Sequence, residues 1–422
     1  MSAPRDRTAW SPEEAERYLL SLELFGMHFG LERMRRLMTA LGNPQRKFGS
    51  IHVVGTNGKS STTRMTAAIL EHHGVRTGAY LSPHLGDYSE RVRIADADIE
   101  PKAFAAAVQR AARAAELVDN AARGADRVTQ FEALTAAAYS ELAAGGVEVA
   151  VIEAGLGGRY DATNVIPSKV QVLTSVGLEH TRWLGPTITD IAREKLAVVQ
   201  PGGVLVLGPR LDPEADAEAR AVAERTGARI VRAAEDPGVP LASLGTFQRR
   251  NFAVARAAAE AYLGELEPEL VAAAAADVRV PGRLQVVDHE PLTLLDGAHN
   301  PDGVAALAES LPEIAAGRRT VAVVSILDDK DAAGMLAALL PVCQAVIVTS
   351  SQNPRALPPP TLQSLIGQIG GPPTEVVADP RAALGRARDL AGTEGVVVAT
   401  GSIYLVADLL RKTPATRRVS ML

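Results

Sequence analysis

The stretch IHVVGTNGKSS, residues 51–61, decides the fold class of this 422-residue chain. A short β-prone run is followed by a loop with two glycines and then by a helical pattern that continues through Leu70. This order is typical of a phosphate-binding loop, because glycines let backbone N–H groups face a phosphate and the helix N-terminus adds partial positive charge. Lys59 and the hydroxyl after it would contact the outer phosphates and Mg²⁺. We therefore expect nucleotide binding, although Val53 stands where the general consensus has its first glycine and an ordinary glycine turn is the alternative.

Outward from this loop, short apolar runs alternate with longer Ala-rich segments. This alternation predicts an α/β protein whose mostly parallel sheets are covered on both faces. The predicted strands are Ile51–Val54, Val149–Ile152, Val170–Ser175, Val204–Leu207, Leu292–Leu295, Val321–Ser325, Ala345–Val348, Val376–Ala378 and Val396–Ala399. The predicted helices include Lys59–His72, Pro101–Leu117, Phe131–Ala144, Phe247–Leu263 and Arg381–Leu390.

The length of the chain exceeds what one hydrophobic core usually supports, so we expect two domains. The alternation pauses at VPGR (280–283) and restarts with a new strand–loop–helix unit. We place the boundary there, giving a phosphate-loop domain at 1–284 and a smaller Rossmann-like domain at 285–422.

The composition excludes several classes of protein. A net charge of -5 and a pI near 6.0 disfavour nucleic-acid binding. The single cysteine, Cys343, excludes an internal disulfide and has apolar neighbours, so we expect a buried, inert thiol. The N-terminus carries acidic residues rather than a secretory pattern, and no apolar run reaches about 18 residues. We expect a soluble cytoplasmic protein that does not bind membranes.

Twelve ordered blocks resemble the folylpolyglutamate synthase/dihydrofolate synthase group of the Mur ligase superfamily. They are HFGLERM (28–34), GTNGKSS (55–61), LSPHL (81–85), ERVRI (90–94), TQFEA (129–133), IEAGLGGRYDATN (152–164), GLEHTRWLG (177–185), AREK (192–195), PGRLQ (281–285), LDGAHNPDG (295–303), DDKD (328–331) and ATGSIYLVADL (399–409). The resemblance implies that ATP phosphorylates a pterin-linked carboxylate. The amine of L-glutamate then attacks the acyl phosphate, giving an amide, ADP and phosphate.

The resemblance also implies Mg²⁺ at two sites, with Ser82, Glu153 and His180 as ligands. Glu153 suits this role chemically because it follows an apolar strand and offers oxygen ligands. His180 is a less usual ligand for a hard cation, and its spacing alone would suggest a capping or buried histidine. Lys195 corresponds to a catalytic lysine that is often carbamylated in this group, with a plain surface lysine as the alternative.

For ATP the resemblance implies Thr56, Asn57, Gly58, Lys59, Ser60 and Ser61 on the loop, together with Asn251, Arg283 and Asp296. Arg283 would reach the γ-phosphate on domain closure, and the fixed fork of arginine suits that role. Asp296 would bind a ribose hydroxyl or the incoming ammonium. His299 would act in catalysis and contact nucleotide or glutamate, and Ser402 is a candidate for the glutamate site.

Three segments match the parts of the family that bind the pterin. They are His28, Phe29, Gly30 and Leu31; Gln130, Phe131, Glu132 and Ala133; and Tyr160, Asp161 and Ala162. Phe131 would stack on a flat ring, with a core position as the alternative. Arg91 and Arg159 are candidate partners for substrate carboxylates.

One residue departs from the pattern of the folate ligases, which usually have glycine after the loop lysine where this chain has Ser60. Cell-wall ligases often have serine or threonine there, so a ligase acting on a UDP-muramyl substrate is an alternative. It is disfavoured because such ligases carry a further domain before the loop. A non-enzymatic nucleotide switch is a second alternative, and either Ser60 or Ser61 is expected to contact the metal. We expect a monomer.

Overall fold

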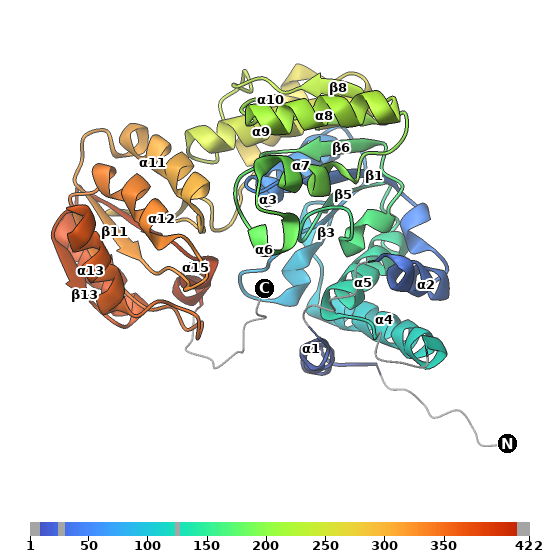
Figure 1. Cartoon of the computed structure of the whole chain (residues 1–422), viewed down its shortest axis with the longest axis horizontal. Coiled ribbons are helices and arrows are strands. Elements are labelled where there is room, and N and C mark those ends of the chain that lie inside the picture. The colour runs from blue at the N-terminus through green and yellow to red at the C-terminus, as the bar shows by residue number, and fades with distance from the viewer. Residues whose placement is uncertain (1–8, 24–29, 123–126, 412–422) are drawn as a thin grey trace. The chain divides into compact units, whose positions relative to one another are not determined.

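The computed structural model describes residues 9–23, 30–122 and 127–411. These residues form two compact units, each with its own sheet (Figure 1). Unit 1 comprises described residues within 9–234 and 254–274, and unit 2 comprises 235–253 and 275–411. Helix α9 (Thr246–Leu263) contributes residues to both units, as does α10 (Pro268–Asp277). The predicted sequence boundary at residue 285 stays a prediction.

Unit 1 contains an eight-stranded sheet in the order β4-β3-β2-β5-β1-β6-β7-β8. The strands run parallel except at one edge, where β3 pairs antiparallel with both β2 and β4. Strand β1 lies in the interior between β5 and β6. The bounds are β1 (Gly49–Val54), β2 (Thr77–Tyr80), β3 (Val92–Ile94), β4 (Ala97–Asp98), β5 (Val149–Glu153), β6 (Val170–Leu173), β7 (Val204–Leu207) and β8 (Arg229–Arg232).

Helices cover both faces of this sheet, since β5 is buried along its whole length. Tyr80 and Ile152 pack in one apolar cluster with helices α1, α2, α4 and α5, whereas Val54 and Leu173 pack in another with α7 and α8. The helices are α1 (Pro12–Ser21), α2 (Glu32–Ala40), α3 (Lys59–His72), α4 (Pro101–Ala122), α5 (Gln130–Ala144), α6 (Thr181–Leu184), α7 (Ile188–Leu196) and α8 (Pro213–Thr226), with short 3₁₀ segments η1 (Pro44–Arg46), η2 (Tyr88–Arg91) and η3 (Ala162–Val165).

Unit 2 contains a six-stranded sheet in the order β13-β12-β11-β14-β10-β9, parallel except for β9 at one edge. The strands are β9 (Gln285–His289), β10 (Leu292–Leu295), β11 (Thr320–Val324), β12 (Ala345–Val348), β13 (Thr374–Val376) and β14 (Val396–Thr400). The helices are α11 (Pro301–Ala315), α12 (Ala332–Leu339), α13 (Pro359–Ile369), α14 (Pro380–Ala391) and α15 (Ile403–Leu410), with the 3₁₀ segment η4 (Leu340–Val342).

The predicted α/β class and mostly parallel sheets are confirmed. The bounds of the strand predicted at Val376–Ala378 are wrong by two residues, because β13 begins at Thr374 and ends at Val376. This strand lies at an edge of the sheet, where polar residues such as Glu375 are tolerated and the apolar pattern shifts.

Cys343 is buried, and burial raises the pKa of its thiol to about 12, as expected for an inert cysteine. None of the described helices is long and apolar enough to span a bilayer.

Candidate nucleotide and metal site

The loop between β1 and α3 is held in place by the neighbouring end of β6. Gly58 precedes α3 with a φ of 85°, and a side chain at Gly55 would overlap the hydroxyl of Thr174. Thr56 N donates to Ser175 O at 2.9 Å, and Asn57 O accepts from Thr174 Oγ1 at 2.7 Å. The loop therefore needs glycine at both positions and keeps its shape through bonds to β6 and the residues after it.

Lys59 opens helix α3 and folds back over the loop. Its Nζ donates to Gly55 O and Thr56 O, both at 3.1 Å. The amine therefore donates to two backbone carbonyl oxygens of the loop. A phosphate oxygen can replace these acceptors.

Glu153 ends strand β5, and its carboxylate lies beside the start of α3. It is 1% exposed and accepts from Ser60 Oγ at 2.8 Å and from Ser82 N at 3.1 Å. Ser60 Oγ also lies 3.4 Å from Ser82 O. One carboxylate and two serines therefore meet here, an oxygen-rich set of the kind that Mg²⁺ accepts while keeping several waters. Ser61 is buried within α3 at 2% exposure.

His180 occupies the residue before α6 and has a left-handed backbone, with φ of 53°. Its ring makes no capping hydrogen bond, and its side chain is 42% exposed. Its Nε2 lies 3.9 Å from the carboxylate of Glu179. His180 is therefore neither a capping nor a buried histidine, the two roles that spacing alone suggested.

Lys195 lies near the end of α7 and points beneath the phosphate loop. Its Nζ donates to Gly55 O at 2.8 Å, and the residue is only 5% exposed, so the surface-lysine alternative is wrong. Burial, helped by the charge of Lys59, lowers the pKa of Lys195 to about 7. The loop at Gly158 packs directly on this helix end, since a Cβ there would lie 2.6 Å from Lys195 O and 2.8 Å from Glu194 O.

The predicted pterin segments differ in what their side chains do. Gln130 donates to Leu19 O at 2.8 Å, and Ala133 is fully buried. The Glu132 carboxylate accepts from Arg33 Nε at 2.6 Å and from Thr129 Oγ1 at 2.9 Å. This carboxylate is therefore engaged in hydrogen bonds that stabilise the fold. Phe131 is partly buried and stacks on Tyr80 with ring centroids 6.3 Å apart.

The third pterin segment surrounds Asp161. Tyr160 is 49% exposed, whereas Asp161 and Ala162 are each 6% exposed. Burial raises the pKa of the Asp161 carboxyl, which accepts from Leu156 N at 2.7 Å and Thr163 N at 3.0 Å. Of the first segment, Gly30 and Leu31 lie before α2, and His28 and Phe29 lie outside the described residues.

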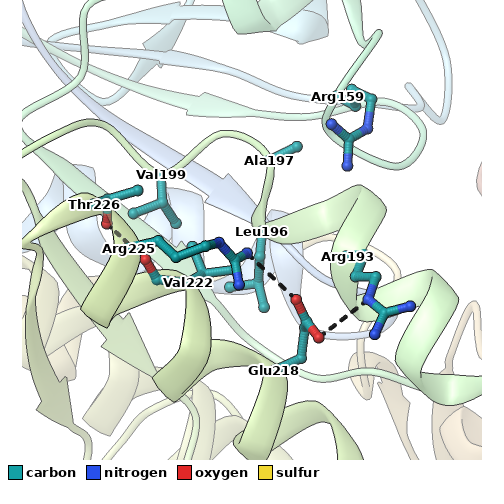
Figure 2. A pocket seen from close by; sticks show the side chains of 9 residues that line it. All are labelled: Arg159, Arg193, Leu196, Ala197, Val199, Glu218, Val222, Arg225 and Thr226. Atoms are coloured by element: carbon teal, nitrogen blue, oxygen red, sulfur yellow. Dashed lines mark hydrogen bonds and ion pairs between the residues drawn. The ribbon is translucent and has the colours of Figure 1, made fainter.

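The two candidate arginines have local partners. Arg91 is 1% exposed, and its Nε donates to His84 Nδ1 at 2.9 Å. Arg159 pairs with Glu194 at 2.8 Å, at the rim of a pocket of about 440 Å³ beside α7 and α8 (Figure 2). In this pocket Glu218 bridges Arg193 and Arg225 across the helices, at 3.1 and 3.5 Å. Arginines near these helix C-termini offset the helix dipoles, so this cluster is explained by the fold.

In unit 2, Asp296 and His299 follow β10 and Ser402 follows β14, whereas Arg283 precedes β9 and Asn251 lies in α9. Asp296 is 2% exposed and accepts from Leu284 N at 2.9 Å and Ala298 N at 2.8 Å; burial raises its pKa. His299 Nδ1 lies 2.9 Å from Gly297 O, and Arg283 donates to Gly282 O at 3.0 Å. Ser402 caps α15, and the Asn251 amide donates to Gln248 Oε1 at 2.9 Å.

Sequence reasoning missed the residues that support the loop. Thr174 and Ser175 are the last two residues of the strand predicted at Val170–Ser175, and they lie just after β6 in the structure. The rule that ligand sites form at the carboxyl ends of parallel strands could have indicated them. His52 was read only as part of a strand, yet it is completely buried and bonded to Thr163.

Residues 282–403 match the family model described as Mur ligase, glutamate ligase domain. The dihydrofolate synthase/folylpolyglutamate synthase of Mycobacterium tuberculosis is 36% identical over 81% of this chain and 78% of its own length. A probable bifunctional folylpolyglutamate synthase/dihydropteroate synthase of Haloferax volcanii is 34% identical over 96% of this chain, which spans only 51% of that longer protein.

Two solved structures are also similar. The M. tuberculosis folylpolyglutamate synthase complexed with ADP has a TM-score of 0.88 and 33% identity, over 94% of this chain and 97% of that one. The bifunctional Yersinia pestis synthase complexed with AMPPNP and Mn ion has a TM-score of 0.85 and 29% identity, over 97% of this chain and 99% of that one. By these similarities the chain belongs to the folylpolyglutamate synthase/dihydrofolate synthase family.

Proposed function

We propose that this protein is an ADP-forming ligase that joins L-glutamate to dihydropteroate and to folylpolyglutamate. The observation that carries the proposal is the Glu153 carboxylate, held by Ser60 and Ser82 beside the phosphate loop. The names of the relatives favour this reaction over the UDP-muramyl ligase and the nucleotide switch.

In the first step, the substrate carboxylate would attack the γ-phosphorus of ATP, forming an acyl phosphate and releasing ADP. Lys59 would exchange its carbonyl partners for phosphate oxygens and so offset the charge there. Ser60, Ser82 and Glu153 would hold Mg²⁺, with His180 as a further ligand, and Ser60 rather than Ser61 is the loop hydroxyl beside Glu153. Bound Mg²⁺ supplies the positive charge that screens carboxylate from phosphate.

In the second step, the glutamate amine would attack the acyl carbon, and phosphate would leave as the nitrogen loses a proton. Asp296 and His299 are candidates for holding either the nucleotide or glutamate. Ser402 is a candidate for glutamate, and Asn251 and Arg283 are candidates for the nucleotide. Asp296 already orders the loop around it through two backbone N–H groups.

A coupled assay of ADP release tests the proposal. We expect ADP release with dihydropteroate plus glutamate, and with reduced folates plus glutamate, and little without either partner. Release of ADP that is indifferent to both would contradict the proposal, and activity on a UDP-muramyl substrate would restore the cell-wall alternative. Light scattering would test the expected monomer, and cell fractionation the expected cytoplasmic location.

Lys195 is suited to carbamylation, because a pKa near 7 leaves a large neutral fraction of the amine at neutral pH. We expect Lys195→Met to lower kcat about 100-fold, a loss typical of removing one charged group from a preorganised site. With ¹³C-labelled bicarbonate, wild type should show a carbamate carbon by NMR that Lys195→Met lacks. Lys169→Met, at a lysine outside the site, is the control. A wild-type spectrum without this carbon would mean that Lys195 acts as an amine.

A further inference from the structure

A buried chain of three side chains links the strand before the phosphate loop to the third pterin segment. His52 lies in β1, two residues before its end, and is 0% exposed. Its Nε2 lies 2.8 Å from Thr163 Oγ1, and that hydroxyl donates to Asp161 Oδ1. The contact between His52 and Thr163 spans 111 positions of the sequence, and it adds a side-chain link between β1 and the loop that follows the neighbouring strand β5.

The direction of these hydrogen bonds follows from the number of protons. The Thr163 hydroxyl has one proton, which it gives to Asp161, so the ring of His52 must donate to the hydroxyl from Nε2. The other ring nitrogen, Nδ1, is buried and has no hydrogen-bond partner among the described residues, as fits an unprotonated nitrogen. Burial also lowers the pKa of His52 to about 4, which keeps the ring neutral.

This direction matters for Asp161. If His52 carried its proton on Nδ1, its Nε2 would accept the Thr163 proton and turn it away from the carboxylate. With the proton on Nε2, both Thr163 N and Thr163 Oγ1 donate to the same oxygen of Asp161, while Leu156 N donates to the other. Tyr139 further anchors the backbone by donating to Thr163 O at 3.0 Å.

We propose that His52 is a positioning residue for the pterin substrate, acting only through the Thr163 hydroxyl to fix Asp161 and the loop from Leu156 to Thr163. The strand that leads into the phosphate loop thereby also sets the place of the loop that receives the pterin. This inference rests on the proposed function, because Tyr160, Asp161 and Ala162 are substrate residues only under that proposal.

A double-mutant cycle tests the inference through steady-state kinetics with dihydropteroate. Thr163→Val keeps the side-chain shape but removes the hydroxyl, so Asp161 Oδ1 loses a donor and His52 Nε2 loses its acceptor. We expect KM for dihydropteroate to rise about tenfold. His52→Phe should raise the same KM several-fold, and the double variant should match Thr163→Val alone within about twofold. His52→Gln, which keeps a donor, should recover part of the loss. KM for ATP should stay within about twofold in every variant.

Thr66→Val is the matched control, since it also removes a buried hydroxyl, one that bonds within α3 to Thr62 O. It should leave KM for dihydropteroate unchanged. Effects of His52→Phe and Thr163→Val that multiply in the double variant, or a KM for ATP that rises equally, would overturn the inference.

The same variants separate this inference from the proposed function. If wild type does not ligate glutamate, the proposed function fails, and dihydropteroate binding by calorimetry still tests the positioning role. ¹⁵N NMR of the histidine rings adds a readout independent of any substrate. We expect a slowly exchanging Nε2–H signal that is absent from His52→Phe and altered in Thr163→Val. An Nδ1–H form of His52 in wild type would contradict the inference.

Discussion

Glu153→Gln is expected to lower kcat for ligation by about 100- to 1,000-fold, and to raise the Mg²⁺ concentration needed for half-maximal rate. The amide fills the same space and can keep both hydrogen bonds, with its oxygen facing Ser82 N and its NH₂ facing Ser60 Oγ. What it loses is the negative charge at the proposed metal site. Preorganised electrostatic groups typically contribute this much to a rate.

Steady-state rates over a series of Mg²⁺ concentrations measure this effect. Glu148→Gln is the control, because Glu148 is exposed next to the opposite end of the same strand and bonds to Arg76 N. The melting temperature of Glu153→Gln, measured by thermal unfolding, should be close to that of wild type. A variant that keeps the wild-type kcat and Mg²⁺ dependence would remove Glu153 from the proposed metal site.

Lys59→Met is expected to reduce ADP formation by about 1,000-fold, the upper end of what one such group contributes. Methionine keeps most of the length of the side chain but cannot donate to Gly55 O, Thr56 O or a phosphate. The charge of Lys59 also lowers the pKa of Lys195, so its removal should raise that pKa. The pH below which Lys195 becomes protonated should therefore move upwards.

Single-turnover ADP formation and nucleotide binding by calorimetry test this variant together. Lys47→Met, at an exposed lysine before β1, should behave as wild type. Wild-type turnover in Lys59→Met would show that the loop binds no reacting phosphate.

The sequence predicted most of the interior strands, but it missed β2, which is buried along its whole length although its sequence TGAY lacks an apolar run. Strands β5 and β14 are buried along their whole length, and β1 is buried from its second residue onward, so their apolar runs are visible without the structure. Strand β8 was missed because it begins and ends with arginine at the sheet edge, and the short β4 lacks an apolar run. Edge strands are under less pressure to be apolar, so periodicity detects them poorly.

For the site, sequence blocks indicated the right neighbourhood but not the partner of each side chain. Arg193, Glu194 and Lys195 are consecutive charged residues, and only the packing of α7 shows that the lysine is the buried one. Glu132 lies in a block expected to bind pterin, yet its carboxylate is bonded to Arg33. The bond from His52 to Thr163 joins distant positions and could not be read from spacing.

The packing of Gly158 against the carbonyls of Lys195 and Glu194 has a consequence for protein engineering. Position 158 excludes a side chain because of its neighbours, without the positive φ that usually requires glycine. The loop and the end of α7 therefore form a single module. Chimeras that exchange residues 153–163 between relatives should transplant residues 188–198 with them, since a loop moved alone would shift the helix that carries Lys195.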